Sequence, residues 1–112
     1  MLHKAQRTEN APAGVRAVTH DLKCWPEFFA AIARGEKRHD LRRATDREFR
    51  SGDRLLLREF DPDRGEYTGQ SQRAVITYIT SADMPCALSE QALNPEFCIL
   101  SISLLSDALP LC

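Results

Sequence analysis

The spacing of apolar and polar residues changes along the chain, and each spacing predicts a different element. Apolar residues that alternate with polar ones are typical of a strand with one buried face. This pattern predicts strands at residues 15–23, 37–42, 54–60, 70–79 and 97–105. In the first of them, Val18, His20 and Leu22 fall on one face. A turn-rich segment joins the third and fourth strands, which therefore predict an antiparallel hairpin.

Residues 25–35 (WPEFFAAIARG) follow a helical spacing instead. Pro26 suits the first helical position, and Phe28, Phe29 and Ile32 then fall on one side of the helix. Gly35 ends the helix, because glycine adopts the left-handed C-cap conformation without steric strain. The pattern predicts a helix that begins at Pro26 and ends just before Gly35.

One helix and about five short strands predict an α+β fold, a small mixed-sheet β-barrel with the helix closing one end. The chain has 112 residues, which is enough for one hydrophobic core, so we expect a single domain over residues 15–105. The polar residues 1–14 are expected to form a flexible leader, and residues 106–112 a loose tail.

Composition favours a cytoplasmic protein without a membrane partner, and we expect a monomer. No apolar run approaches the ~20 residues of a membrane-spanning helix, and residues 1–14 lack the apolar segment of a secretory signal. The four cysteines contain no C-x-x-C pair and have no fixed spacing to the three histidines. We therefore expect free thiols, no metal site and no cofactor.

Charge is segregated along the chain, although the net charge is only −1. Residues 34–54 contain eight basic and five acidic side chains, whereas residues 55–112 contain three basic and eight acidic ones. A nearly neutral protein with a local positive field is suited to one anionic ligand at one place. The distribution favours a defined site over a surface that coats nucleic acid.

The basic segment allows two interpretations. On an extended strand Arg38, Asp40 and Arg42 share one face, and Leu41 is expected to point inward from the other. Asp40 can neutralise the arginines in a surface network of small energetic value. It can also fix the arginine fork so that the remaining N–H groups face a phosphate or a base edge. The spacing of the residues leaves both interpretations open.

Lys23 and Trp25 precede the helix whose other end leads into the basic segment, so both ends of the helix can border one cleft. An aromatic side chain beside cationic groups is a common way to hold single-stranded nucleic acid. A single tryptophan in a small domain is also a common core residue. The sequence leaves open which of the two roles Trp25 has.

The segment from Gly35 to Arg42 (GEKRHDLR) resembles the G-x-K-x-x-E-x-R signature of the ASCH domain, the activating signal cointegrator homology domain of the PUA-like superfamily. Asp40 stands at the position of the signature glutamate. The order of helix, signature, F-x-x-G-D and Y-T-G is also similar to a small bacterial and phage branch of that group, described only as a domain of unknown function. The resemblance covers about residues 19–104.

This resemblance implies a PUA-like barrel with a basic cleft beside the first helix, in which Lys37, Asp40 and Arg42 face RNA or a nucleotide. Together with the charge pattern it favours an RNA- or nucleotide-binding module. The expected binding residues are Lys23, Trp25, Lys37, Asp40, Arg42 and Arg43.

Two other classes of function remain as alternatives. Some ASCH-like proteins are ribonucleases, and the resemblance implies Lys37, Asp40 and Arg42 as the catalytic residues of such an enzyme. Others are amidohydrolases that act on acylated cytidine and use a threonine where this chain has Asp40. Amide hydrolysis ranks last among the enzymatic alternatives, because the hydroxyl is missing and a carboxylate near Lys37 favours its ammonium form. The third class is a protein-interaction module.

Overall fold

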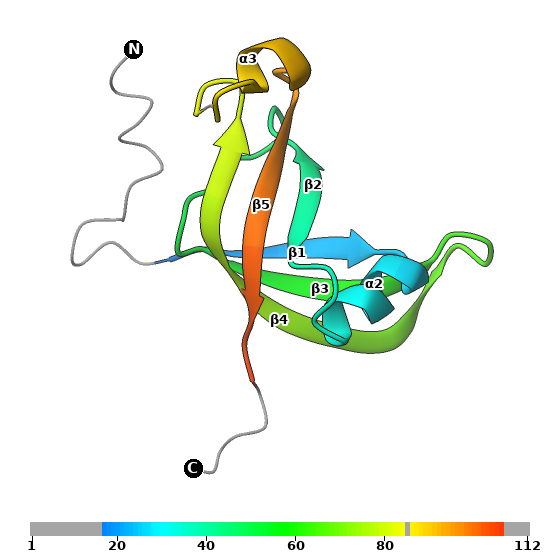
Figure 1. The fold of residues 1–112 in the computed structure, drawn as a ribbon. Coiled ribbons are helices and arrows are strands. Elements are labelled where there is room, and N and C mark those ends of the chain that lie inside the picture. Colours follow the sequence, from blue (N-terminus) through cyan, green and yellow to red (C-terminus); the bar gives the residue numbers. More distant parts are fainter. Residues whose placement is uncertain (1–16, 85, 107–112) are drawn as a thin grey trace.

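The structure, a computed structural model, describes residues 17–84 and 86–106 (Figure 1). The predicted leader and all but the first residue of the predicted tail lie outside the described residues, as do the first two residues of the first predicted strand. Strand β1 (Thr19–Cys24) has the alternation expected from the sequence, because His20, Leu22 and Cys24 are buried and the residues between them are exposed.

Helix α2 (Pro26–Ala33) begins and ends as predicted, with Trp25 as its N-cap and Gly35 at a φ of 80° behind the C-cap residue Arg34. The helix packs against strand β3 (Arg54–Asp61) (Figure 1). Ile32 is fully buried and Phe29 packs against the core, whereas Phe28 is exposed. Consecutive residues lie ~100° apart around a helix, so adjacent phenylalanines do not both face the core.

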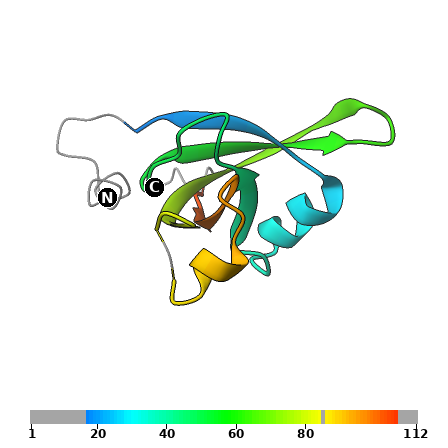
Figure 2. The same cartoon turned by 90° about the horizontal axis from the view of Figure 1, so that it is seen from above.

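Strands β3 and β4 (Glu66–Ser81) form the predicted hairpin, but its tip is shorter than expected. Residues 66–69, assigned to a loop from their turn-forming composition, belong to β4. Glu66 and Tyr67 pair with Asp61 and Phe60, and the register shifts between this pair of residues and Ser71. The tip is tight because the backbone N–H of Gly65 donates to the carbonyl of Asp61 at 2.8 Å, while the Asp61 carboxylate accepts the backbone N–H of Asp63 at 3.0 Å. The hairpin therefore projects from the body of the molecule as a long arm (Figure 2).

The remaining elements are strand β2 (His39–Arg43), the single helical turn α3 (Ser89–Ala92) and strand β5 (Phe97–Leu104). The sheet has the order β1-β3-β4-β5-β2, in which β1 pairs with β3 in parallel and all other pairs are antiparallel. The sheet curves into a half-barrel (Figures 1 and 2). Within the described residues its edge strands β1 and β2 form no backbone ladder with each other, so the expected barrel is not closed.

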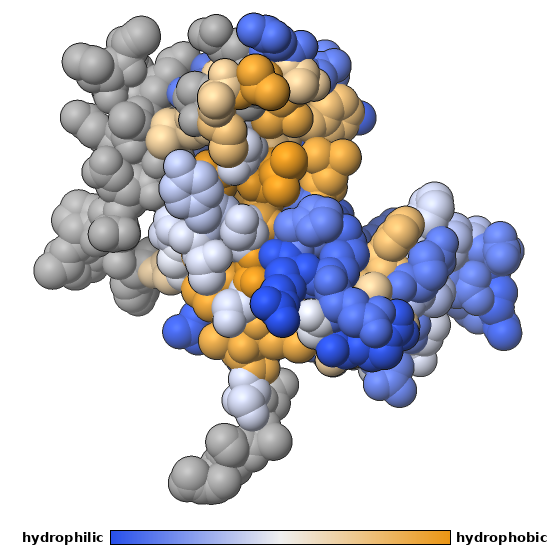
Figure 3. All heavy atoms as spheres, in the orientation of Figure 1, coloured by the Kyte–Doolittle hydropathy of each residue, from blue (hydrophilic) through white to orange (hydrophobic). Residues whose placement is uncertain are grey.

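The hydrophobic core lies on the concave side of this half-barrel. Its side chains are buried residues of strands β1, β3, β4 and β5 and of α2, with Leu55, Leu57 and Leu100 fully buried. Hydrophilic residues gather toward the lower right of Figure 3, where the hairpin tip lies, and apolar residues gather along β5. In the part of the chain that the structure describes, no helix has the length and apolar character needed to cross a membrane.

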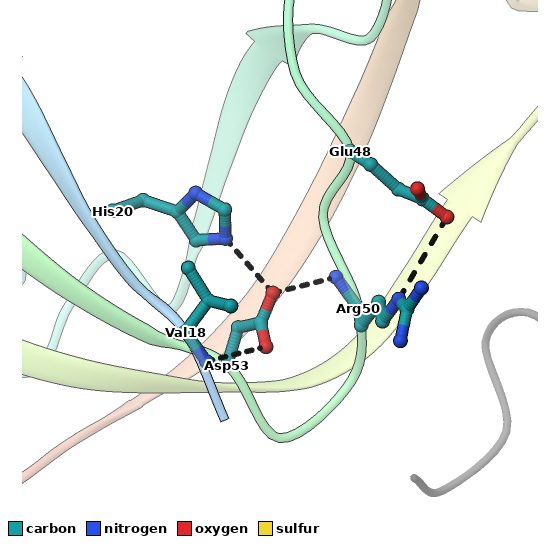
Figure 4. Close-up of polar contacts among 5 residues, drawn as sticks. All are labelled: Val18, His20, Glu48, Arg50 and Asp53. Atoms are coloured by element: carbon teal, nitrogen blue, oxygen red, sulfur yellow. Dashed lines mark hydrogen bonds and ion pairs between the residues drawn. The ribbon is translucent and has the colours of Figure 1, made fainter. Parts of the chain in front are cut away.

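A buried carboxylate joins the start of β1 to the loop before β3 (Figure 4). Asp53 accepts hydrogen bonds from the backbone N–H of Val18 at 3.2 Å and of Arg50 at 3.0 Å. Because a carboxylate can only accept, the 2.8 Å contact places the proton on Nε2 of His20, which is also buried. His20 is thus a structural residue, and the loop is held in place beside the sheet edge.

Candidate functional site

An open cleft of about 510 Å³ lies between the end of β1, the start of α2 and strand β2. Its walls are formed by Lys23, Cys24, Trp25, Phe28, Lys37, His39, Asp40, Leu41 and Arg42. Five of the six residues expected from the sequence meet here: Lys23, Trp25, Lys37, Asp40 and Arg42. The sixth, Arg43, does not line this cleft.

Arg42 spans the gap between the two edge strands. Its Nε donates to Oδ2 of Asp40 at 2.8 Å, and its Nη2 donates to the backbone carbonyl of Lys23 at 2.7 Å. A side chain thus joins β2 to β1 where the backbone ladder does not. In the described residues Arg42 uses two of its five N–H donors in these bonds.

The expectation that Leu41 points inward is wrong. Asp40 is buried, whereas Leu41 is 57% exposed at the mouth of the cleft. The alternation of β2 is therefore as predicted, but its faces are exchanged. The ion pair accounts for the exchange, because a carboxylate that turns inward accepts a charge-assisted hydrogen bond from Nε of Arg42. The Nη2 of the same guanidinium reaches the backbone of β1. Arg38 does not reach Asp40, since its Nε donates to the carbonyl of Gly35 at 3.0 Å.

Two aromatic rings form the outer wall of the cleft. Trp25 is 48% exposed and Phe28 is 45% exposed, and their rings are stacked with centroids 6.4 Å apart and 19° between their planes. The Lys37 ammonium lies 5.7 Å from the centroid of Phe28. Phe28 was expected on the same face as Phe29 and Ile32, so its place in the cleft was missed. Trp25 lies three residues before Phe28, a spacing that brings two side chains to the same side of a helix. This spacing could have indicated that Phe28 lines the cleft together with Trp25.

The two lysines of the cleft have different surroundings. Nζ of Lys37 donates to Nε2 of His39 at 3.4 Å. His39 thus lies in the site, although it was not among the residues expected there from the sequence. Nζ of Lys23 lies 4.3 Å from the ring centroid of Phe60 on the hairpin. The cleft thus combines three cationic side chains with one buried carboxylate, and its net charge is positive.

Cys24 lies against Asp40 in this cleft. Burial raises the pKa of its thiol to about 11, and the Asp40 carboxylate acts in the same direction. The thiol is therefore neutral at pH 7 and is not a nucleophile there. No group of metal-ligating side chains is present among residues 17–84 and 86–106.

Arg43 lies on the outer face of β2. Its Nη1 is 3.5 Å from Oε1 of Glu96, and its guanidinium lies 5.2 Å from the centroid of Phe97. Both partners are at the start of β5 or just before it. Arg43 thus contacts residues at the start of β5 and does not line the cleft.

These features define a small α+β half-barrel protein with an open, positively charged cleft bordered by exposed aromatic rings. The chain belongs to a family described as a domain of unknown function (DUF3850), whose model matches residues 19–102. The match includes every residue that lines the cleft. No curated protein matches the chain.

Proposed function

We propose that the protein is an RNA- or nucleotide-binding module and that the cleft between β1, α2 and β2 is its binding site. The observation that carries this proposal is the combination of two exposed, stacked aromatic rings with the cations Lys37 and Arg42 in one cleft. Neither feature alone indicates a nucleotide site, because exposed aromatic residues and surface cations are each common.

The arrangement suits a nucleotide in two ways. Trp25 offers a half-exposed indole on which a base can stack, a contact worth roughly 1–3 kcal/mol per base. A phosphate beside that base would meet the Lys37 ammonium and the Arg42 N–H groups that are not bonded to Asp40 or Lys23. Asp40 orients the guanidinium fork before a ligand arrives, so less side-chain entropy is lost on binding.

We further propose that the half-barrel is of the PUA-like type and that the ASCH resemblance is a true relationship. Support comes from the signature positions, because Lys37, Asp40 and Arg42 all line one cleft beside the first helix. The resemblance implies this arrangement for a bound RNA or nucleotide.

Trp25 makes the test direct, because it is the one tryptophan of the chain. We expect its fluorescence to change when uridine monophosphate or a short single-stranded RNA is added, with an affinity for RNA that falls steeply with salt. Lys37→Ala should weaken RNA binding roughly fivefold and reduce the log–log salt slope by about 0.7. Arg64→Ala is the matched control, since it removes one positive charge at the exposed hairpin tip. No change in Trp25 fluorescence and no amide NMR shifts at low and physiological salt would refute the proposal.

A second candidate, cleavage of RNA, is favoured by the pairing of Lys37 with His39. A neutral imidazole can take the proton of a 2′-hydroxyl as that oxygen attacks the adjacent phosphorus, while Lys37 and Arg42 stabilise the charge on the phosphate. The 5′-oxygen then leaves with the electron pair of its bond to phosphorus and takes up a proton from the imidazolium or from water, and a 2′,3′-cyclic phosphate remains. Incubation of a labelled RNA should give this product with the native protein and none with His39→Ala. Intact RNA after incubation with excess native protein would leave binding as the function.

A further inference from the structure

A second hollow, of about 340 Å³, adjoins the cleft along the gap between β1 and β2. Lys23 and Arg42 line both spaces. The hydrogen bond from Arg42 to the Lys23 carbonyl crosses the gap between them, so the cleft and the hollow lie on either side of one bridge. Trp25 lines the cleft on one side of this bridge, and Tyr67 lines the hollow on the other.

The hollow repeats the chemistry of the cleft with different residues. Its cations are Lys23, Arg42, Arg43 and Arg47, and its carboxylates are those of Asp21 and Asp46, so its net charge is also positive. The combination again suits phosphate, with carboxylates nearby that can accept hydrogen bonds from hydroxyl or amino groups.

Tyr67 supplies an aromatic surface at this second position. It is an exposed residue of the hairpin arm, its ring is in edge contact with Phe60 at 5.2 Å, and the Arg58 guanidinium lies 3.9 Å from its centroid. Lys23 contacts the same Phe60 ring from β1. Flat aromatic and guanidinium groups of this kind stack on nucleic-acid bases.

We infer that the ligand of this protein is a single-stranded polynucleotide that runs along the gap between β1 and β2, with one base at Trp25 and a later nucleotide in the hollow at Arg47 and Tyr67. This inference rests on the proposed function and specifies its ligand. The four residue steps from Asp21 in β1 to Trp25, the residue after this strand, extend ~13 Å at ~3.3 Å per residue. A stacked strand advances ~3.4 Å per nucleotide, so a single nucleotide does not fill this length.

The experiment compares uridine monophosphate with uridylate oligomers of two and six nucleotides, using Trp25 fluorescence for the native protein and for three variants. Arg47→Ala and Tyr67→Ala change side chains that line the hollow and do not line the cleft. Arg64→Ala again controls for the loss of one charge. The hexamer is used as RNA and as DNA, because the carboxylates of the hollow can accept a 2′-hydroxyl that only RNA has.

We expect the hexamer to bind the native protein at least tenfold more tightly than the monophosphate. Arg47→Ala and Tyr67→Ala should each weaken hexamer binding about fivefold or more, and both should leave monophosphate binding unchanged. Equal affinities for dimer and hexamer, or hexamer binding that neither variant weakens, would overturn the inference and leave the cleft as a nucleotide site. Failure of every ligand to change Trp25 fluorescence or to shift amide NMR resonances would instead refute the proposed function itself.

Discussion

Replacement of Arg42 by alanine tests whether this residue joins the two edges of the half-barrel. The change removes the bonds to Asp40 at 2.8 Å and to the Lys23 carbonyl at 2.7 Å. It also leaves the Asp40 carboxylate, whose side chain is 10% exposed, without its cation. The loss of one partner of a fully buried ion pair costs about 3–5 kcal/mol. Because the Arg42 side chain is 23% exposed and water screens it in part, we expect about 2–4 kcal/mol here.

Urea unfolding followed by far-UV circular dichroism measures this loss, and it reports the whole sheet rather than the surroundings of Trp25. Asp40→Asn combined with Arg42→Ala should be less destabilised than the sum of the single variants, by at least ~1 kcal/mol, because the uncompensated charge is gone. Arg64→Ala should leave the free energy of unfolding unchanged. If Arg42→Ala costs less than ~1 kcal/mol, the bridge does not stabilise the half-barrel and Arg42 is available entirely to a ligand. Because Arg42→Ala is expected to destabilise the fold, weaker binding by this variant would not by itself show that Arg42 contacts the ligand.

Two further predictions concern buried groups outside the proposed contacts. Asp53→Ala leaves the N–H donors of Val18, Arg50 and His20 without their acceptor. The free energy of unfolding in urea should fall by about 3–5 kcal/mol. A variant as stable as the native protein would show that water replaces the carboxylate. Burial raises the pKa of the Cys24 and Cys98 thiols from 9.0 to about 11, so unfolded thiols ionise at lower pH than folded ones. The stability that results, on the order of 2 kcal/mol per thiol, should be complete below pH 9 and lost between pH 9 and 11. The decrease in the free energy of unfolding from pH 9 to 11 should be smaller in Cys98→Ala than in the native protein, and an equal decrease would contradict the prediction.

The helix could be predicted from the sequence because its boundaries depend on local chemistry. Pro26 fixes φ at a value that suits the first helical turn, and Gly35 adopts the left-handed C-cap conformation without steric strain, so the limits of α2 follow from these two residues. The tip of the hairpin was misjudged for the opposite reason. Residues 66–69 have turn-forming composition, and the pairing of Glu66 and Tyr67 with β3 makes them part of β4.

The site could be predicted as a set of residues but not as a geometry. Period-two alternation shows that Asp40 and Leu41 lie on opposite faces of β2, yet it does not show which face is buried. Hydrophobicity favours Leu41, and the contacts of Asp40 with an arginine that also reaches β1 outweigh it. Trp25 could not be assigned for a similar reason, because the position of an N-cap residue relative to β2 depends on tertiary packing.

The two ends of the sheet have consequences for the order in which the protein folds. The hairpin pairs Asp61 with Glu66, only five residues apart, whereas β2 reaches its partner through His39 and Ser101, which are 62 residues apart. Closing long loops costs more entropy and slows pairing, so β1 and β2 are expected to join a sheet nucleated by β3, β4 and β5. The cleft between β1 and β2 would then form last and open first. Native-state hydrogen exchange should therefore be faster at the backbone amides of β1 and β2 than at those of β3, β4 and β5. Local opening of these two edge strands would give a ligand access to the cleft between them.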